Sequence, residues 1–346
     1  MVGSGNNKLY LNGELITNLV IPNGVTSIGA DAFYNCSALT SVTIPDSVTS
    51  IGQGAFGGCT GLTSVAIGNS VTSIGDYVFS YCAGLTSITI PDSVTSIGNW
   101  AFFVCNGLTS ITIPDSVTFI GVRAFQNCSG LTGVTIGNGV TRIGDVAFSG
   151  CSGLTSVTIG NGVTRIGELA FFCCSGLTSI TIPDSVTSIG WGAFSGCSGI
   201  ESLEVGVGNK KYHSANNCII ETDTKKLVVG CKASVIPSDG SVTSIGSSAF
   251  NGCSALTSVT IGNSVTSIGS SAFDGCSGLK TVFYQGSAEQ WSKVSIDSYN
   301  GYLKNATRYY YSETEPALNA EGTAYDGNFW HYDADGITPV IWKKEN

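Results

Sequence analysis

The 346-residue chain contains 42% hydrophobic and only 11% charged residues, with 46 glycines and 13 cysteines. Such a composition is typical of a chain that forms a packed core, not of a disordered one. The net charge is −9, and residues 1–200 contain only four cations, Lys8, Arg123, Arg142 and Arg165. This excludes a nucleic-acid-binding groove, which needs clustered lysine and arginine. Ser, Thr, Gly or Asp interrupts every apolar run, so we predict no membrane-inserted segment.

The first fifteen residues, MVGSGNNKLYLNGEL, differ from the rest of the chain. They lack the basic start and the apolar run of a secretion signal, so we predict no signal peptide in this chain. We expect residues 1–15 to form an N-terminal cap, in which the segment Leu9–Ile16 covers the end of the core.

A single 23-residue unit then returns about ten times. Its clearest marker is a phenylalanine at a constant spacing of 23 residues, interrupted once: Phe33, Phe56, Phe79, Phe102, Phe125, Phe148, Phe171 and Phe194, followed by Phe250 and Phe273. A fixed period of this length is the signature of a solenoid, in which one turn cannot bury its apolar face without its neighbours.

The apolar pattern of one unit is L-x-x-V-x-I-x-x-x-V-x-x-I-G-x-x-A-F-x-x-C. Its V-x-I part alternates with period two and predicts a short strand with Val and Ile inward. The V-T-x-I-G part predicts a second extended segment, and the stretch through Ala-Phe predicts one helical or 3₁₀ turn. Pro-Asp and Gly-Asn pairs predict the turns between the strands. The expected fold is a leucine-rich-repeat-like, right-handed curved solenoid, mainly β, with short helical or 3₁₀ turns.

The repeated cysteines occupy one position of the unit and are expected to form a column inside the solenoid: Cys36, Cys59, Cys82, Cys105, Cys128, Cys151, Cys174, Cys197, Cys253 and Cys276. Identical side chains in a stack lie side by side, which is poor geometry for a disulfide. We interpret them as small buried hydrophobic residues. No C-x-x-C pair supports a zinc site.

The unit IPDSVTSIGxxAFxxCxGLTSVTI resembles the BspA-like, Treponema pallidum-type class of leucine-rich repeats, and the resemblance covers residues 16–285. It implies a curved solenoid, an extracellular or cell-surface location, and adhesion to host proteins or to other cells. The family has no catalytic residues to carry over. The chain departs from the family pattern because it shows no signal peptide.

The array is interrupted between Cys197 and Cys253, where CIIETDTKKLVV predicts a hairpin that turns near Asp223 and Thr224. Cys218 and Cys231 lie at roughly opposite register and are the only plausible disulfide pair, but the sequence leaves their pairing open. Near the C-terminus, FWHYDADGITPVIW predicts an aromatic hairpin that turns at Asp335 and Gly336. The predicted division is repeats at 16–205, a hairpin insertion at 206–235, repeats at 236–285, a C-terminal cap at 286–311, and an acidic linker with the aromatic hairpin at 312–346.

The sequence offers little for catalysis. Its two histidines, His213 and His331, lie in irregular parts of the chain, with no G-x-S-x-G motif nearby. The acidic residues are mostly those of the Pro-Asp turns. The segment from Asp333 to Gly336 contains a fragment of a calcium-loop pattern but lacks the distant Glu ligand, so a hairpin turn explains it better. We expect no enzyme activity, no cofactor and no metal.

Variation within the uniform array is the better guide to a binding surface. The candidate partner-binding residues are aromatic substitutions and two arginines one period apart: Tyr34, Tyr77, Tyr81, Trp100, Phe103, Phe119, Phe172 and Trp191, with Arg142 and Arg165. The aromatic rings either dock a partner or pack sideways onto neighbouring turns. The arginines either bind a carboxylate or sulfate or are solvated near Asp145 and Glu168. A strand face rich in Thr and Ser is an alternative contact surface.

Two hypotheses for function follow. The first is a non-enzymatic surface or secreted leucine-rich repeat protein that binds a protein or glycan ligand. The second is a structural spacer that displays another module. We expect a monomer that binds no nucleic acid.

Overall fold

The computed structural model describes residues 7–344. The chain is a β-solenoid of about 14 turns with a period of roughly 23 residues and very little helix. It divides into two compact units. Unit 1 is Met1–Ile200 with Val205–Asn209, and unit 2 is Glu201–Glu204 with Lys210–Asn346.

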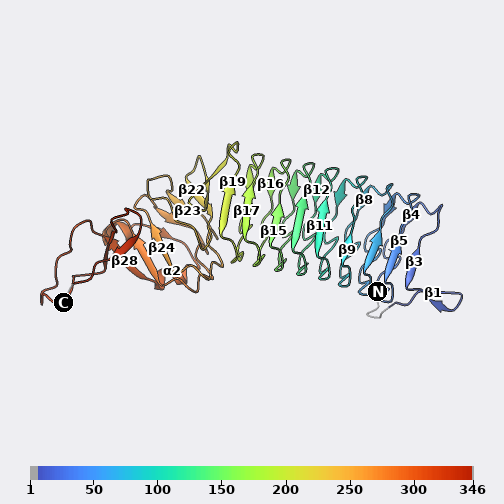
Figure 1. Ribbon diagram of the computed structural model, residues 1–346, viewed down its shortest axis with the longest axis horizontal. Coiled ribbons are helices and arrows are strands. Elements are labelled where there is room, and N and C mark those ends of the chain that lie inside the picture. Colours follow the sequence, from blue (N-terminus) through green and yellow to red (C-terminus); the bar gives the residue numbers. More distant parts are fainter. Residues whose placement is uncertain (1–6, 345–346) are drawn as a thin grey trace. The chain divides into compact units, whose positions relative to one another are not determined.

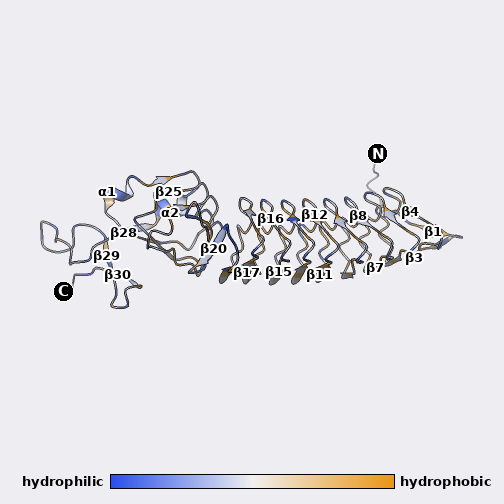
Figure 2. Cartoon of the chain, turned by 90° about the horizontal axis from the view of Figure 1, so that it is seen from above, coloured by the Kyte–Doolittle hydropathy of each residue, from blue (hydrophilic) through white to orange (hydrophobic). Residues whose placement is uncertain are grey.

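Two rows of parallel strands build unit 1, and they lie along opposite sides of it (Figures 1 and 2). The strands of the first row are β3 (Asn18–Val20), β5 (Ser41–Thr43), β7 (Ser64–Ala66), β9 (Ser87–Ile88), β11 (Ser110–Ile113), β13 (Gly133–Ile136), β15 (Ser156–Thr158) and β17 (Ser179–Ile182). Those of the second row are β4 (Ser27–Ile28), β6 (Ser50–Ile51), β8 (Ser73–Ile74), β10 (Ser96–Ile97), β12 (Phe119–Ile120), β14 (Arg142–Ile143), β16 (Arg165–Ile166) and β18 (Ser188–Ile189). A hairpin of β1 (Tyr10–Leu11) and β2 (Glu14–Leu15) precedes them, and all four of its strand residues are exposed.

The strand prediction for the V-x-I segment is confirmed by burial along β11. Ser110 and Thr112 are exposed, whereas Ile111 and Ile113 are buried. Neighbouring strands pair exactly one period apart, as Val134 pairs with Ile111. The side chains of equivalent positions therefore lie next to one another along the array, and each repeat position becomes a column.

The stretch around Ala-Phe, expected to form a short helical or 3₁₀ turn, instead forms hydrogen-bonded turns that contain left-handed residues. Backbone N–H groups alternate between two kinds of partner. The N–H of Phe56 donates to the carbonyl of Val78 in the next turn (3.0 Å), while that of Ala55 closes a local turn onto Gly52 (3.2 Å). The residues two before and two after the phenylalanine have positive φ, as at Gly54 (64°) and Gly58 (74°). A helix would direct these N–H groups along the chain and leave the neighbouring turn unpaired.

The interior contains the repeated phenylalanines and cysteines. Phe125 is fully buried and stacks between Phe102 and Phe148, with ring centroids 5.0 and 5.1 Å apart. The cysteine thiols of the interior also form hydrogen bonds, which the sequence does not reveal. Cys128 donates its S–H to the carbonyl of Phe102 at 3.0 Å, and equivalent thiols do the same in neighbouring turns. Cysteine at this position therefore fills apolar space and also adds a hydrogen bond to a carbonyl of the preceding turn, which already accepts the N–H of Cys105.

Burial has a consequence for pH. Desolvation raises the pKa of Cys59 to about 12, from an ordinary value of 9.0, and raises the pKa values of Cys82 and Cys105 well above that ordinary value. The unfolded chain ionises these thiols from about pH 9, whereas the folded chain keeps them protonated. We therefore expect the free energy of unfolding to fall as pH rises from about 9 to 12.

Urea unfolding followed by circular dichroism at pH 7.5, 9 and 10.5 measures this dependence. The matched variant Cys59→Ala/Cys82→Ala/Cys105→Ala should lose stability less steeply across the same interval, although it is less stable at pH 7.5. Equal slopes for the two proteins would show that the buried thiols do not cause the alkaline loss.

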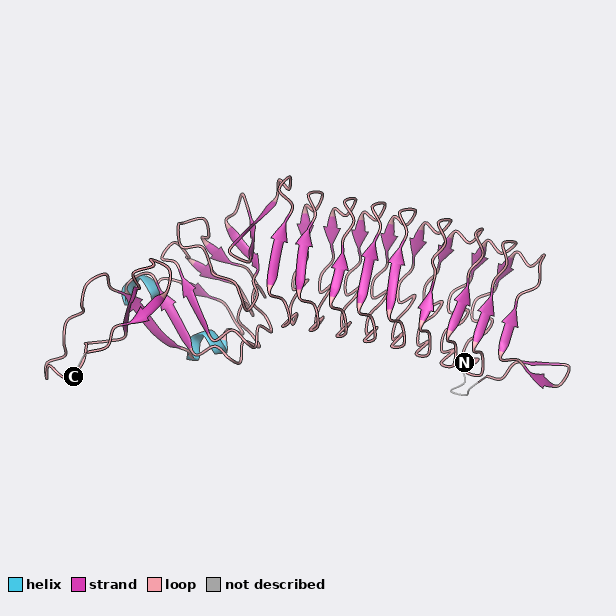
Figure 3. Cartoon of the chain, viewed as in Figure 1, coloured by secondary structure: helices cyan, strands magenta, loops and turns pink. Residues whose placement is uncertain are grey.

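Unit 2 contains two sheets (Figure 3). The strands of the first, in spatial order, are β20 (Tyr212–Ala215), β21 (Cys218–Glu221), β22 (Lys226–Val229), β23 (Ser244–Ile245), β25 (Ser267–Ile268) and β27 (Ser295–Ile296). Those of the second are β24 (Ser258–Ile261), β26 (Thr281–Tyr284), β28 (Thr307–Tyr311), β29 (Phe329–Tyr332) and β30 (Pro339–Ile341). Strand β19 (Ser202–Val205) contains residues of both units.

Both hairpins predicted from the sequence are confirmed. Strands β21 and β22 pair antiparallel, with the turn over residues 222–225. Strands β29 and β30 also pair antiparallel, and Gly336 in their turn has a φ of 68°. Cys218 and Cys231 are buried and carry free thiols.

The C-terminal hairpin belongs to the packed part of unit 2, because β29 pairs in parallel with β28. Trp330 of β29 is fully buried, and its indole N–H donates to the carbonyl of Tyr284 at 2.9 Å. Within the region expected to form the C-terminal cap, 286–311, Trp291 is also buried, whereas Tyr302 is 41% exposed.

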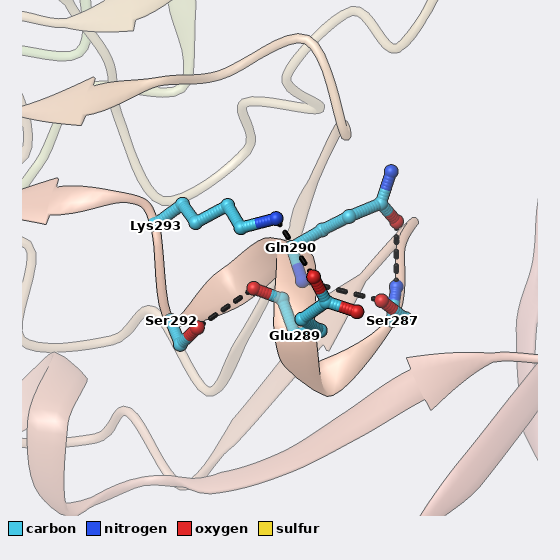
Figure 4. A network of polar contacts seen from close by, with 5 residues as sticks. All are labelled: Ser287, Glu289, Gln290, Ser292 and Lys293. Carbon is cyan, nitrogen blue, oxygen red and sulfur yellow. Dashed lines mark hydrogen bonds and ion pairs between the residues drawn. The ribbon is translucent and has the colours of Figure 1, made fainter.

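The two helices of the described residues, α1 (Ala288–Trp291) and α2 (Gly301–Asn305), both lie in unit 2. Helix α1 starts with a capping box, shown in Figure 4: the Ser287 hydroxyl accepts the N–H of Gln290, whose side chain accepts the N–H of Ser287. This reciprocal pair satisfies two N–H groups that a helix start leaves free. An exposed ion pair between Lys293 and Glu289 (2.8 Å) spans the same turn.

Candidate ligand-binding surface

Two of the predicted aromatic residues form a column on the outside of unit 1. Tyr77 and Trp100 occupy the same repeat position in successive turns, and their rings stack with centroids 5.1 Å apart and planes 7° apart. The guanidinium of Arg123, one further period along, lies 5.7 Å from the centroid of the Trp100 ring. Cation–π attraction and ring stacking therefore order these three side chains along the array. Arg123 was not among the residues predicted from the sequence, although its spacing of 23 residues from Trp100 indicates this contact.

A second column lies on the second row of strands. Phe119 of β12, Arg142 of β14 and Arg165 of β16 pair in register across adjacent parallel strands. The guanidinium of Arg142 lies 6.0 Å from the centroid of the Phe119 ring. Arg165 approaches Asp145 at 3.9 Å, a long contact between partly exposed side chains. At the equivalent position the neighbouring strands β8, β10 and β18 carry serine.

The two columns overlap along the chain. The first ends at Arg123 and the second begins at Phe119, so both residues lie in the same turn, four positions apart. We call the six side chains of the two columns the aromatic–arginine surface: Tyr77, Trp100, Arg123, Phe119, Arg142 and Arg165. It contains three of the four cations of residues 1–200.

The remaining candidates lie outside these columns. Tyr81 and Phe103 form an edge-to-face pair with centroids 5.1 Å apart, and Tyr81 is 52% exposed. Tyr34 lies where a Cβ on Gly57 would contact its ring at 3.0 Å, so that ring packs onto the following turn. Phe172 is half-buried, and Trp191 is 51% exposed in a later turn. The two alternatives for the aromatic residues are therefore not exclusive, since rings that pack sideways also stay partly exposed.

Three of the aromatic residues adopt a left-handed backbone conformation, which is unfavourable for residues with a side chain. Tyr77, Tyr81 and Trp100 have φ of 59°, 59° and 52°. This left-handed region is uncommon for residues other than glycine and costs of the order of 1–3 kcal/mol. Glycine occupies the equivalent positions of an earlier turn, at Gly54 and Gly58. Other bulky residues share this conformation, as at Val146 (62°) and Leu169 (53°), so the backbone of the turn tolerates large side chains at this position.

On the Thr and Ser face, the alternative contact surface, the column of threonines before the first-row strands already uses its hydroxyl groups. Thr86 donates its hydroxyl to the carbonyl of Thr63 (3.1 Å), and Thr132 donates to the carbonyl of Thr109 (3.0 Å). A hydroxyl has a single proton, so these groups have no donor left for a ligand. The column is better explained by its bonds between turns.

The residues considered for catalysis are dispersed. His213 lies 3.0 Å from the hydroxyl of Thr222, and His331 contacts the carbonyl of its neighbour Tyr332. Within residues 7–344, no group of three or more His, Cys, Asp or Glu side chains is placed to hold a metal ion. Asp335 accepts the N–H groups of Ile337 and Thr338 and the Thr338 hydroxyl, and these bonds lower the pKa of its carboxyl. Its role is that of a turn residue.

A known family model matches the repeats of this chain. The model of the BspA type leucine-rich repeat region, written for six copies, matches residues 6–132, 120–239 and 229–301. The chain belongs to this family. The resemblance inferred from the repeat unit and the predicted solenoid are thereby confirmed. No curated protein matches the chain.

Solved structures of bacterial leucine-rich repeat proteins are similar to this chain. A leucine-rich cell surface protein from Faecalibacterium prausnitzii A2-165 is 30% identical, with 82% of this chain and 91% of that chain covered and a TM-score of 0.48. The Treponema pallidum leucine-rich repeat protein is 32% identical, with 54% and 78% covered and a TM-score of 0.44. A protein from Bacteroides ovatus ATCC 8483 is 24% identical, with 88% and 93% covered and a TM-score of 0.43.

Neither helix of the described residues is long and apolar enough to cross a bilayer. The BspA-type proteins are typically surface proteins of bacteria, and leucine-rich repeat proteins typically bind other proteins and are generally non-enzymatic.

Proposed function

We propose that this protein is a non-enzymatic surface or secreted repeat protein that adheres to a protein or glycan ligand through the aromatic–arginine surface. The observation that carries the proposal is the Tyr77–Trp100–Arg123 column. It places ordered, partly exposed rings and a guanidinium group side by side, at a repeat position where other turns carry glycine, valine or leucine. Aromatic and arginine side chains are the types most enriched among residues that dominate binding energy.

The surface location rests on the family and on the F. prausnitzii protein, which is described as a cell surface protein. Binding without catalysis fits the dispersed histidines and the Thr hydroxyls already used between turns. The alternative function, a structural spacer, has a different requirement: every outward side chain should be replaceable without loss of function.

The double variant Tyr77→Gly/Trp100→Gly tests the proposal. Purified wild-type chain is applied to arrays of extracellular-matrix proteins, mucins and glycans, and saturable binding is measured. We expect the variant to bind at least about 30-fold more weakly, as for the loss of a binding hot spot. Its stability should stay close to that of the wild type, because glycine relieves the left-handed strain while the ring stacking is lost.

The matched control is Val146→Gly/Leu169→Gly. Both residues occupy the same repeat position as Trp100 and have φ of 62° and 53°. This variant makes the same backbone change without removing a ring, and it should retain binding. Saturable binding that survives in both variants would move the site away from this surface, and failure of the wild type to bind any arrayed ligand would support the spacer.

A further inference from the structure

We propose that the ligand of the aromatic–arginine surface is an acidic peptide segment of a protein partner, in which carboxylates are interspersed with apolar side chains. This inference rests on the proposed function and names the chemical class of the ligand. It follows from the positive charge of the column of Phe119, Arg142 and Arg165, and from the side chains that cover the ring faces of Trp100 and Phe119.

The two arginines of the second column lower the stability of the sheet unless an anion binds to them. Arg142 and Arg165 are paired directly across neighbouring strands, and like charges in such a pair destabilise a sheet. Serine takes this position in the neighbouring strands β10 and β18, so the fold does not require a cation there. Asp145 offsets the charge only in part, because its Oδ1 lies 3.9 Å from Arg165 and accepts the N–H of Glu168 at 3.0 Å. The guanidinium groups thus remain able to bind carboxylates.

The central ring, Trp100, presents its edge and not a face. Tyr77 and Arg123 flank the two faces of Trp100, and Arg142 lies over a face of Phe119. A neutral sugar that stacks on an aromatic side chain needs an open ring face, which Trp100 lacks. Ring edges carry positive partial charge, and the indole N–H and phenol O–H are donors. Carbonyl and carboxylate oxygens of a peptide match these groups.

The charge of the whole chain disfavours a densely sulfated glycan. The net charge is −9, and Asp145 and Glu168 lie beside the arginine column. A polymer with closely spaced sulfates would meet this repulsion along its length, whereas a peptide with a few carboxylates can place them at the guanidinium groups. The same net charge disfavours a second copy of this chain as the partner.

The test uses the full chain and three probes: a random copolymer of glutamate and tyrosine, a random copolymer of lysine and tyrosine, and heparin. Binding is measured by the fluorescence of the protein's tryptophans and by biolayer interferometry. We expect saturable binding of the glutamate–tyrosine copolymer that weakens with added salt, and weaker binding of heparin. Any binding of the lysine–tyrosine copolymer comes from the net charge of −9 and should not weaken in Arg142→Gln/Arg165→Gln.

The variant Arg142→Gln/Arg165→Gln should lower affinity for the glutamate–tyrosine copolymer by at least about tenfold, the loss expected when charge-assisted hydrogen bonds are removed. The control Lys280→Gln/Lys304→Gln changes the net charge equally at two exposed lysines of unit 2 and should leave affinity unchanged. Tighter binding of heparin, or equal losses in the two variants, overturns the assignment of an acidic peptide.

These outcomes are separable from those of the proposed function. If an arrayed ligand binds and is lost in Tyr77→Gly/Trp100→Gly, but the glutamate–tyrosine copolymer does not bind, the surface is a binding site and the acidic-peptide inference is wrong. If the copolymer binds and Arg142→Gln/Arg165→Gln abolishes it while Tyr77→Gly/Trp100→Gly does not, the arginine column alone forms the site. The role proposed for the aromatic column then fails.

Discussion

The variant Phe125→Ala should be less stable than the wild type by about 3–5 kcal/mol, the range for removing a large buried aromatic side chain. Phe125 is fully buried in the middle of the array and stacks against a ring on each side. Its removal leaves a cavity that the rigidly paired strands cannot close, and it interrupts the contact of Phe102 with the following turns. Urea unfolding of the variant and the wild type measures the difference.

The control for this substitution is Phe103→Ala. Phe103 neighbours the buried column in sequence but is half-buried, with one edge-to-face contact to Tyr81. We expect a much smaller loss of stability. Equal losses would mean that the phenylalanine stack contributes no more than an exposed ring does, and the column would not be the source of cohesion between turns.

The second large effect is expected at the glycine that follows the second-row strand. A Cβ on Gly144 would lie 2.6 Å from the backbone carbon and oxygen of Gly121 and 2.7 Å from the oxygen of Ile120. All three are backbone atoms of the preceding turn. The oxygen of Ile120 also accepts a hydrogen bond from the N–H of Gly144 at 2.9 Å, which holds the two turns together. Gly144→Ala must therefore separate two paired turns, and overpacking of this kind costs about 1–3 kcal/mol.

Gly133→Ala provides the matched comparison. Gly133 lies in strand β13, where a Cβ would meet only the Ser156 hydroxyl at 3.7 Å, an ordinary contact. Alanine there should be neutral or slightly stabilising, because glycine weakens a strand. Calorimetry measures the melting temperatures of the two variants and of the wild type. A Gly144→Ala protein as stable as the Gly133→Ala protein would contradict the close approach of the turns.

The turn around Ala-Phe shows where local patterns mislead. Its sequence is compatible with one helical turn, but Phe56 and Gly54 donate their N–H groups to the next turn of the solenoid. Those bonds require left-handed residues nearby, including bulky ones such as Val104 (φ 60°) and Trp100 (φ 52°). Contacts between turns override local preference here, since a fixed stacking distance makes each turn adopt the backbone of its neighbours.

The candidate surface was predictable in part. Residues one period apart become spatial neighbours in a solenoid, so the contacts of Tyr77 with Trp100 and of Phe119 with Arg142 follow from their spacing. The position of Arg123 beside Trp100 follows from the same rule, although Arg123 was not among the predicted residues. The spacing could not indicate that the Thr hydroxyls already donate to carbonyl groups, as at Thr86.

The sequence by itself determined the 23-residue period, the inward positions of Val, Ile, Phe and Cys, and the two hairpins, because each depends on residues close in the chain or repeated at constant spacing. Only the tertiary structure decided which side chains face solvent at the left-handed positions, where the thiol protons go, and that Trp330 of the C-terminal hairpin packs into unit 2. These features depend on hydrogen bonds between turns and on pairing between β28 and β29, which bring together residues that no local pattern connects.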